Sequence, residues 1–446
     1  MRLPDAAAAR VGAVPLPSAR AATYAKRREA TSKRSEGWPR VPYDLLIKGG
    51  HVLDPGQAID RRMDIAISDG AIAAIQPEIS ASEASRVLEV RGSNRYVVPG
   101  LIDVHTHVAY GATTPGVGIG CVDPDVGGVG SAVTTVLDAG SVGIANVGVF
   151  GAHLLPKAKT RVICYVNVGT FAHSTPAAAD VMHMEDIDRK AIASCIRANP
   201  GLIRGFKLRL VGPVVQERGE DVVRLSKEIA NEHGVPLMVH IGDGRHPDRA
   251  RAGELTRFLL KTLTAGDILT HLCTPNPGGV MDAREAAQSV VPELEEARAN
   301  GVLIDSALGR GNFGIEVARR QAELGVRPDT TSSDLTAGGR RLGVGLLDSM
   351  AKFMSVGYSL SDVVRMTTLN AARGIGLGDQ LGAVAVGREA DLSIFDVVEG
   401  KWKFTDTLNQ VFTGTQALVP VQTIRKGELF SPEWGPYAWG WLPEQA

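Results

Sequence analysis

VVPGLIDVHTH, residues 97–107, is the stretch of this chain that decides its fold. The apolar run has the character of a β-strand, and it ends in His105 and His107. Alternate residues of a strand point to the same face, so two imidazoles can share one metal ion there. An H-x-H pair on its own is as often a surface or structural feature, and the later segments decide between these interpretations.

Four later segments have the same form, a short apolar run with a metal-binding side chain at or near its carboxyl end. They are RGFKLRL (204–210) with Lys207, PLMVHIGD (236–243) with His240, DILTHLC (267–273) with His271, and TTSSD (330–334) with Asp334. A (β/α)8 barrel carries its catalytic groups at the carboxyl ends of its strands. The order H-x-H, K, H, H, D therefore predicts a metal-dependent hydrolase.

Strand-like and helix-like runs alternate between residues 101 and 378, as they do in βαβ units. Strands are expected at 101–107, 132–140, 161–168, 204–210, 236–242, 267–273, 302–308 and 330–334. Helices are expected at 220–233, 252–263, 313–325 and 359–377, the last with Ser361 as its N-cap. The predicted fold class is α/β, with a (β/α)8 TIM-like barrel.

The segments on both sides of the barrel have short alternating strands. Residues 43–79 carry Asp69-Gly70, a hairpin signal, and a similar pattern returns over 390–430. We therefore expect a small β-sandwich domain built from both ends of the chain, residues 41–100 plus 379–432, with the barrel domain 101–378 between them. Residues 1–40 have little to bury and are expected to be a disordered tail.

Composition limits the partners and the compartment. The 446 residues are 44% hydrophobic with a net charge of −1, so there is no basic field for nucleic acid. No apolar run approaches the roughly 20 residues of a membrane span, and the tail lacks the apolar core of a signal peptide. Four scattered cysteines without C-x-x-C spacing suit a reducing compartment. We expect a cytoplasmic protein with a small-molecule substrate and neither a nucleic-acid nor a membrane partner.

Lys207 is the unusual member of the set. It lies between Phe206 and Leu208, so it should be buried, and burial disfavours the charged ammonium. A neutral lysine amine can react with CO2 to give a carbamate, an anion able to bridge two cations. The alternatives are a lysine that reaches solvent or pairs with an acid. Beside the other ligands, the N-carboxylated form is the better explanation.

His240 and His271 on successive strands are interpreted as ligands of a second ion, whereas a single histidine there would fit a core role. Asp334 can bind a metal through one oxygen and accept a proton with the other, its alternative role being a helix N-cap. This ligand set suits two divalent ions, Zn²⁺ with Mn²⁺ or Co²⁺ as substitutes. Asp138 and Asp305 are expected either to hold a histidine ring in place or to be structural.

With these motifs the chain resembles the amidohydrolase superfamily of binuclear metal hydrolases. The resemblance covers residues 43–430 and rests on YDLLIKGG, VVPGLIDVHTH, the later ligand positions and GREADLSIFD. It is strongest to the dihydroorotase-like and amidohydrolase/deacetylase branch, through TTVLDAGSVG, RGFKLRL, PLMVHIGD, DILTHLC and PDTTSSDL. The resemblance implies attack by a metal-bridging hydroxide, with Asp334 moving the proton to the leaving group. It also implies a homo-oligomer, for which the residues give no signal.

Two loops depart from that branch. LGRGNFG has Arg310 where a histidine is expected, and LTAGG replaces His-Gly after Asp334. The substrate therefore differs from that of related enzymes. Arg209 and Arg310 are candidates to bind a substrate carboxylate, since guanidinium suits two-pronged contacts, although either can be an ordinary ion pair. Further candidates for substrate contact are Tyr165, Asn167, His173 and Asn312.

The preferred function is hydrolysis of a linear amide or ester, such as an N-acyl amino acid or an O-acyl hydroxy acid. The alternative is ring opening of a cyclic amide, as in dihydroorotase or hydantoinase chemistry, which uses the same metal centre. A deaminase is disfavoured because one-metal relatives of that type generally lack the bridging lysine. A scaffold protein on an inactive hydrolase fold is disfavoured because all six ligands are present.

Overall fold

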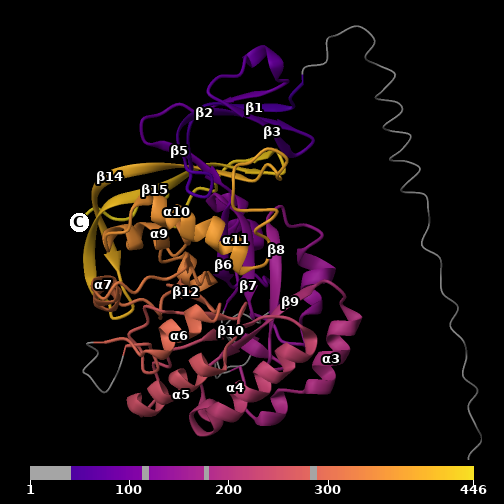
Figure 1. The fold of residues 1–446 in the computed structure, drawn as a ribbon, viewed down its shortest axis with the longest axis vertical. Coiled ribbons are helices and arrows are strands. Elements are labelled where there is room, and N and C mark those ends of the chain that lie inside the picture. Colours follow the sequence, from indigo (N-terminus) through magenta and orange to yellow (C-terminus); the bar gives the residue numbers. More distant parts are fainter. Residues whose placement is uncertain (1–41, 113–119, 175–179, 282–288) are drawn as a thin grey trace, which may run out of the picture. The chain divides into compact units, whose positions relative to one another are not determined.

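A computed structural model describes residues 42–112, 120–174, 180–281 and 289–446 (Figure 1). The expected tail, residues 1–40, and part of the Gly-rich loop 111–130 lie outside the described residues. Residues 43–446 form one compact unit. This unit contains two sheets, a barrel of parallel strands and a mixed sheet.

The barrel contains all eight expected strands, hydrogen-bonded in sequence order. They are β6 (Leu101–Thr106), β7 (Val133–Ala139), β8 (Arg161–Asn167), β9 (Ile203–Arg209), β10 (Leu237–His240), β11 (Ile268–Thr270), β12 (Leu303–Ala307) and β13 (Thr330–Ser332). The last strand meets the first just beyond β13, where the amide of Asp334 donates to the carbonyl of His105 at 2.8 Å and that of His107 donates to Leu335 at 2.9 Å. These two bonds bring three of the predicted ligands to the seam of the barrel.

Helices separate most of the barrel strands along the chain, and the last four helices follow β13. They are α2 (Pro124–Gly127), α3 (Arg189–Ala198), α4 (Pro213–His233), α5 (Arg249–Thr262), α6 (Glu293–Ala299), α7 (Ile315–Glu323), α8 (Ala337–Arg340), α9 (Leu346–Ser355), α10 (Leu360–Thr367) and α11 (Leu369–Gly374). Short 3-10 turns cover Ala81–Glu83, Val129–Ser131, Ala172–Ser174 and Met184–Asp186, and a π-helical turn covers Phe150–Leu154. Helix α4 packs against β9 and β10, and α5 packs against both α4 and α6.

The expected closing helix differs in two respects. It is divided at Thr368 into α10 and α11, and its N-cap is Ser359, so the assignment to Ser361 was wrong. Ser359 has an extended backbone, and its hydroxyl accepts a hydrogen bond from the amide of Asp362 at 3.1 Å. The Asp362 carboxylate accepts from the Ser359 amide at 2.9 Å, which completes a capping box. Ser361 lies inside the first turn, where it cannot take this role.

Both ends of the described chain build the second sheet. Its strands are β1 (Leu45–Asp54), β2 (Ile59–Ser68), β3 (Ala71–Gln76), β4 (Val87–Glu89), β5 (Arg95–Pro99), β14 (Leu392–Thr405), β15 (Val411–Arg425) and β16 (Glu428–Phe430). The order is β16-β15-β14-β5-β1-β2-β3, with β4 on β1, so the N-terminal and C-terminal strands join where β5 pairs with β14. The turn at Asp69-Gly70 links β2 and β3, as its sequence predicts.

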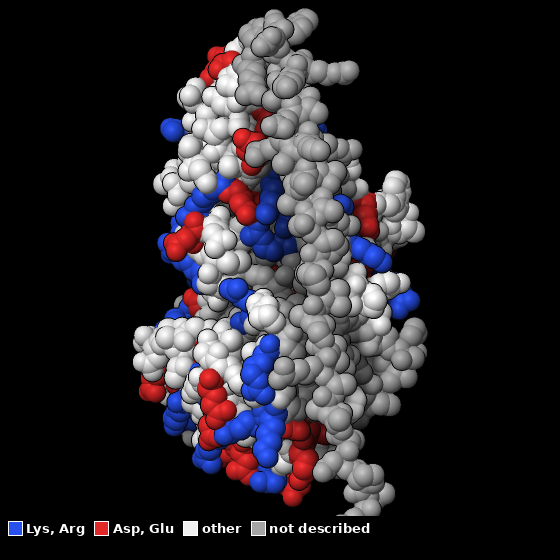
Figure 2. Space-filling model, turned by 90° about the vertical axis from the view of Figure 1, so that its right-hand side faces the viewer, with Lys and Arg blue, Asp and Glu red and all other residues white. Residues whose placement is uncertain are grey.

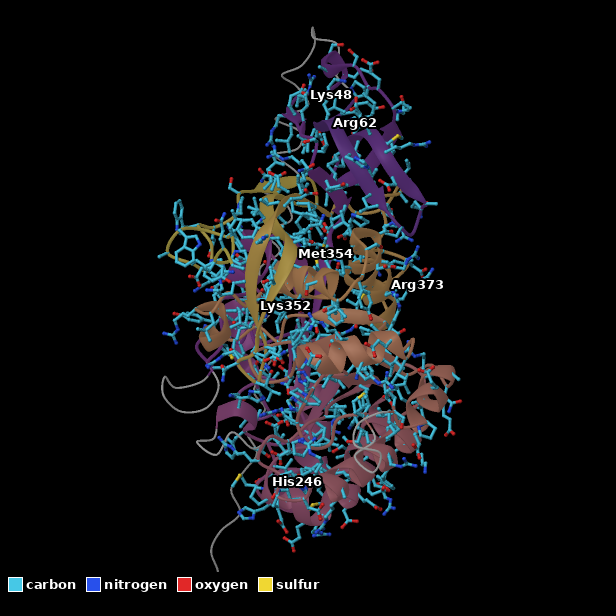
Figure 3. All side chains as sticks on the ribbon, turned by 90° about the vertical axis from the view of Figure 1, so that its left-hand side faces the viewer. Lys48, Arg62, His246, Lys352, Met354 and Arg373 are labelled. Carbon is cyan, nitrogen blue, oxygen red and sulfur yellow. The ribbon has the colours of Figure 1, made fainter. Side chains whose placement is uncertain are left out.

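The barrel interior below the site is apolar. Ile102, Leu137, Tyr165 and Met238 form a buried cluster that continues into Ala371 of α11. Lys48 and Arg62 of the mixed sheet lie at one end of the structure and His246, after β10, at the other (Figure 3). On the face in Figure 2, basic and acidic side chains of the described residues are interspersed. Within the described ranges, no helix has the length and apolar character that crossing a membrane requires.

Candidate metal centre

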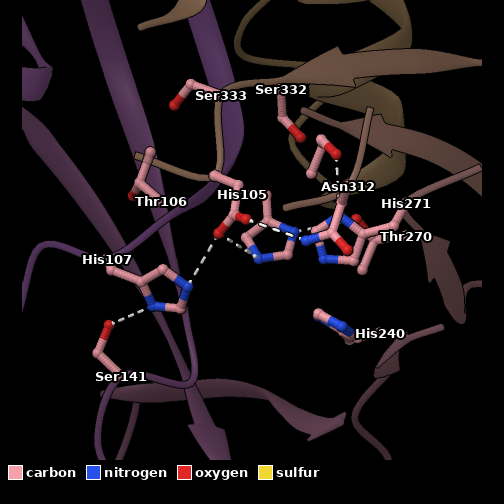
Figure 4. Close-up of polar contacts among 12 residues, drawn as sticks. His105, Thr106, His107, Ser141, His240, Thr270, His271, Asn312, Ser332 and Ser333 are labelled. Carbon is pink, nitrogen blue, oxygen red and sulfur yellow. Dashed lines mark hydrogen bonds and ion pairs between the residues drawn. The ribbon is translucent and has the colours of Figure 1, made fainter. Parts of the chain in front are cut away.

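His105, His107 and Asp334 meet at the carboxyl end of the barrel. One possible ligand atom from each lies within 4.8 Å of the other two. The Nε2 atoms of His105 and His107 are 3.5 Å and 3.2 Å from Oδ1 of Asp334 (Figure 4). Both histidines are nearly inaccessible to solvent. The H-x-H pair and the last predicted ligand, more than 220 residues apart in the sequence, therefore form one group.

Lys207 of β9 is completely buried beside this group. Its Nζ atom lies 3.1 Å from Nε2 of His105 and 3.6 Å from the sulfur of Met238. Burial lowers the pKa of Lys207 to about 7, and the nearby Asp334 carboxylate only partly opposes that effect. The amine is therefore neutral in a large fraction of molecules near pH 7, as the flanking apolar residues predict.

His240 and His271 lie on the side of His105 that is opposite to His107 (Figure 4). Their rings are 4.1 Å apart between centroids, and the His271 ring is 4.9 Å from that of His105. Nδ1 of His271 is 2.8 Å from the carbonyl oxygen of Ala307, and Nε2 of His240 is 3.3 Å from that of Gly242. A carbonyl only accepts hydrogen bonds, so these nitrogens carry the protons. Nε2 of His271 and Nδ1 of His240 are left with their lone pairs.

Burial lowers the pKa of His271 to about 4 and the pKa values of His105 and His240 well below their usual range. All three are therefore neutral near pH 7, the protonation state that binds metal. Nε2 of His271 is buried and has no hydrogen-bond partner among the residues that the structure describes. Such a buried lone pair costs free energy unless a donor or a cation meets it. This nitrogen, the neutral rings and the Asp334 carboxylate fit divalent metal ions of the zinc type.

Asp334 remains ionised although it is buried. Burial alone would raise the pKa of its carboxyl group, but interactions with the nearby His107, His271 and Lys207 side chains lower it below the usual value. Its Oδ2 has one long contact, 3.5 Å from the Nδ2 of Asn312. The N-cap of α8 is Thr336, so Asp334 does not have the capping role that was its alternative.

Two glycines make room for these groups. Gly309 has a φ of +54°, and a Cβ atom there would lie 2.3 Å from Oδ2 of Asp334. Gly140 has a φ of +75°, and a Cβ atom there would lie 2.5 Å from Cβ of Lys207. Both positions therefore need glycine, for the backbone conformation and for the close approach.

Hydroxyl groups connect two ligand histidines to buried carboxylates. Nδ1 of His107 contacts Oγ of Ser141 at 2.8 Å, and this hydroxyl donates to Asp138 at 2.7 Å. Nδ1 of His105 contacts Oγ1 of Thr270 at 3.0 Å, and Thr270 donates to Asp305 at 2.7 Å (Figure 4). Asp138 and Asp305 thus support the histidines through an intervening side chain. The sequence analysis missed Ser141 and Thr270, whose only signal is that each lies within three residues of a predicted ligand or acid.

A chamber of about 340 Å³ opens over the ligands. Besides the ligands, its lining includes His173, Arg209, Arg310 and Asn312. It adjoins a second cavity of about 620 Å³ that shares Arg209, His240 and Asn312 with it. Four of the side chains considered for substrate contact therefore line the space above the ligands.

These side chains differ in their availability to a substrate. Arg209 Nη1 lies 3.5 Å from Oδ1 of Asp180, so the ion-pair alternative applies to it. Asn167 donates to Oδ2 of the same Asp180 at 2.6 Å and supports that carboxylate. His173 is buried, and its ring is 4.7 Å from that of His107. Among the described residues neither of its nitrogens has a hydrogen-bond partner, although Nε2 lies 3.5 Å from Oδ1 of Asp180. Burial lowers the pKa of His173 well below its usual range, so the ring is neutral.

Tyr165 is not brought to the chamber. It lies in the apolar cluster inside the barrel, 2% exposed, with its ring against the backbone of Gly205. Tyr165 comes two residues before Asn167, the last residue of β8, so it lies about 6.6 Å deeper along the strand. The expectation that Tyr165 contacts substrate was wrong for this reason.

Comparison with known proteins agrees with this arrangement. The model of the amidohydrolase family matches residues 96–430. A deacetylase from Enterococcus faecalis is 29% identical over 402 residues, which cover 87% of this chain and 100% of that protein. Solved structures of an adenine deaminase and a dihydroorotase are 28% and 27% identical, with TM-scores of 0.76 and 0.73. They cover 87% of this chain, and 100% and 99% of their own chains. Since the family model matches well over half of its residues, this chain belongs to the amidohydrolase family of hydrolytic enzymes that act on carbon–nitrogen bonds.

Proposed function

We propose that this enzyme removes the acyl group from a small linear amide or ester that carries a carboxylate, such as an N-acyl amino acid or an O-acyl hydroxy acid. The relatives named deacetylase, which match this chain over most of its length, support the reaction class. The observation that carries the substrate class is Arg310. It is exposed at the chamber above the ligands and has no ion pair within the described part of the chain.

Two divalent ions, Zn²⁺ in our proposal, would be held by the neutral histidines and the carboxylate. His105, His107 and Asp334 suit one ion, and His240 and His271 suit the other. We propose that Lys207 is N-carboxylated and would bridge them. Its neutral amine attacks the carbon of CO2, an N–C bond forms as one C=O π bond opens to a carboxylate oxygen, and the proton lost by the nitrogen passes to water. When bound, the ions supply Lewis acidity for the scissile carbonyl and for the attacking water.

Asp334 is the proton carrier in this proposal. Its lowered pKa keeps it ionised, so it can accept a proton from water as the oxygen attacks the acyl carbon. The proton then moves from Asp334 to the leaving nitrogen or oxygen as the bond to the acyl carbon breaks. The products are a carboxylic acid and an amine or alcohol, and the carboxylate of Asp334 is restored.

His173 and Asn312 are placed to orient the substrate. The His173 imidazole is neutral, and Oδ1 of Asp180, 3.5 Å from Nε2, is too far for a good hydrogen bond. Its single N–H can therefore donate to the substrate oxygen on which negative charge develops. Asn312 contacts Asp334 and lines both cavities, so its amide can hold the acyl or the acid part. Arg310 would bind the carboxylate, and the second cavity gives room for the rest of the molecule.

Ring opening of a cyclic amide is the second candidate, because the similarity to a solved dihydroorotase covers 87% of this chain and 99% of the dihydroorotase chain. A panel of substrates separates the candidates: N-acyl amino acids, O-acyl hydroxy acids, cyclic ureides and imides, and adenine, each with zinc-loaded enzyme. We expect turnover of the linear set, measured as proton release. Turnover of the cyclic compounds alone, or ammonia release from adenine, would contradict the proposal.

A further inference from the structure

Two ligand histidines are each joined to a buried carboxylate by one hydroxyl group. Ser141 stands between His107 and Asp138, with contacts of 2.8 Å and 2.7 Å. Thr270 stands between His105 and Asp305, with contacts of 3.0 Å and 2.7 Å. Both hydroxyl-bearing residues and both acids are 0% exposed, so bulk solvent does not compete for these bonds. The same three-group arrangement thus occurs twice, on different strands.

The carboxylates determine the direction of each chain of hydrogen bonds. Asp138 also accepts from the amides of Ser141 and Val108 at 2.9 Å and 2.8 Å. Asp305 also accepts from the hydroxyls of Thr330 at 2.8 Å and Ser332 at 2.8 Å. Within the described residues, the hydrogen-bond partners of these two acids are amide N–H and hydroxyl groups, all able to donate, which fits an ionised carboxylate that only accepts.

A hydroxyl has a single proton, so it cannot donate to the carboxylate and to the imidazole together. When Ser141 donates to Asp138, its oxygen must accept from Nδ1–H of His107. When Thr270 donates to Asp305, it must accept from Nδ1–H of His105. The hydrogen bond that Nδ1 makes to the hydroxyl oxygen therefore fixes the tautomer of each imidazole. Nε2 of both rings then carries the lone pair. In the metal-free protein, Oδ1 of Asp334, 3.5 Å and 3.2 Å from these nitrogens, is the competing acceptor against which the two hydroxyls hold this tautomer.

We propose that Ser141 and Thr270 are positioning residues that hold His107 and His105 in the Nδ1–H tautomer, ready to bind metal through Nε2. Each carboxylate orients the hydroxyl that donates to it, and the oxygen of that hydroxyl then accepts from the imidazole, so the acid acts on the ring without direct contact. The alternative is that the two hydroxyls only fill space. Isosteric replacement of Thr270 by valine keeps the shape and removes the hydrogen bond, so it separates these roles.

The test is the tautomer of each histidine in the metal-free protein, read from ¹⁵N chemical shifts of ¹⁵N-histidine-labelled enzyme. Signals are assigned with His105→Gln and His107→Gln. We expect Nδ1–H for both rings in the wild type, a change of His105 alone in Thr270→Val, and a change of His107 alone in Ser141→Ala. Thr270→Ser should restore the His105 signal. Finding Nε2–H for both rings in the wild type would overturn the proposal without any variant.

Metal affinity is the second measurement. It depends on the proposed metal centre, whereas the tautomer measurement on metal-free protein does not. Loss of either hydroxyl should weaken binding of the first Zn²⁺ about 10- to 100-fold in a competitive titration with a chelator. Thr135→Val is the matched control, because the Thr135 hydroxyl is buried on β7 without a partner. Unchanged affinity in both hydroxyl variants, or an equal loss in Thr135→Val, would refute a positioning role. Expected tautomers with no Zn²⁺ binding at all would instead count against the proposed metal centre.

Discussion

Nζ of Lys207, on β9, lies 3.1 Å from Nε2 of His105, on β6, at the mouth of the barrel. Neither side chain has meaningful contact with solvent. A charged ammonium is costly at this depth, and a neutral amine there can be carboxylated. This one contact therefore connects the stability of the metal-free protein to the chemistry that we propose for the loaded enzyme.

The stability of the metal-free enzyme should depend on Lys207 above neutral pH. The pKa of this lysine falls from 10.5 to about 7 on folding, because it is buried. Between these values the folded chain binds fewer protons than the unfolded one, so stability rises with pH by up to about 1.4 kcal/mol per unit. Urea unfolding of chelated protein in CO2-free buffer should show this slope relative to Lys207→Met. Parallel curves for the two proteins would contradict a buried, neutral Lys207.

Gly309→Ala should displace the Asp334 carboxylate, which is the proposed proton carrier. The new Cβ atom would lie 2.3 Å from Oδ2 of Asp334, and the φ of +54° disfavours alanine. A shift of this carboxylate by about 1 Å should lower kcat about 100-fold. Gly311→Ala, two residues further on, is the control, because a Cβ atom there meets no atom within 4 Å. Equal rates for the two variants would show that Asp334 tolerates the displacement.

His173→Leu should lower kcat without loss of metal. Among the described residues neither ring nitrogen has a hydrogen-bond partner, and Nε2 has a long contact of 3.5 Å with Oδ1 of Asp180, so the substitution leaves the described hydrogen bonds intact. If it donates to the developing oxyanion, kcat should fall about 100-fold while KM changes little. Elemental analysis of the same samples gives the metal content. Full activity in His173→Leu would exclude the donor role, and loss of metal would instead indicate a structural or ligand role.

Arg310→Met should raise KM for substrates that carry a carboxylate. Loss of a charge-assisted contact of about 1.5–3 kcal/mol corresponds to a roughly 10- to 100-fold increase, with kcat nearly constant. The corresponding substrates with a neutral amide in place of the carboxylate should be unaffected. Arg319→Met, which removes an exposed guanidinium on α7, is the control. The same increase for charged and neutral substrates would contradict carboxylate binding by Arg310.

The sequence predicted the barrel well and brought the candidate ligands to one end of it, because both depend on local patterns. Each strand is an apolar run, and His105, His240 and Asp334 lie where such runs end. Depth along a strand is harder to predict, and Tyr165 shows why. Its spacing from Asn167 gives the correct face of β8, but only the structure shows that its ring lies below the mouth.

Hydroxyl groups were the other limit of the sequence analysis. Ser141 and Thr270 are common residue types in strands and turns, and nothing in their spacing separates a hydrogen-bonded linker from a packed side chain. The same ambiguity affected the N-cap of α10, where Ser359 and Ser361 both lie within four residues of the apolar pair Val363-Val364. The backbone conformation of Ser359 decides between them, and that conformation is a property of the folded chain.

The central claim is that Lys207 bridges two ions as a carbamate. The most direct measurement compares wild type and Lys207→Ala after loading with Zn²⁺ in ¹³C-bicarbonate, by elemental analysis and ¹³C NMR. The account predicts two ions per chain and a carbamate signal in the wild type. In Lys207→Ala it predicts at most one ion, no such signal and little turnover. Two ions and full turnover in Lys207→Ala would contradict it.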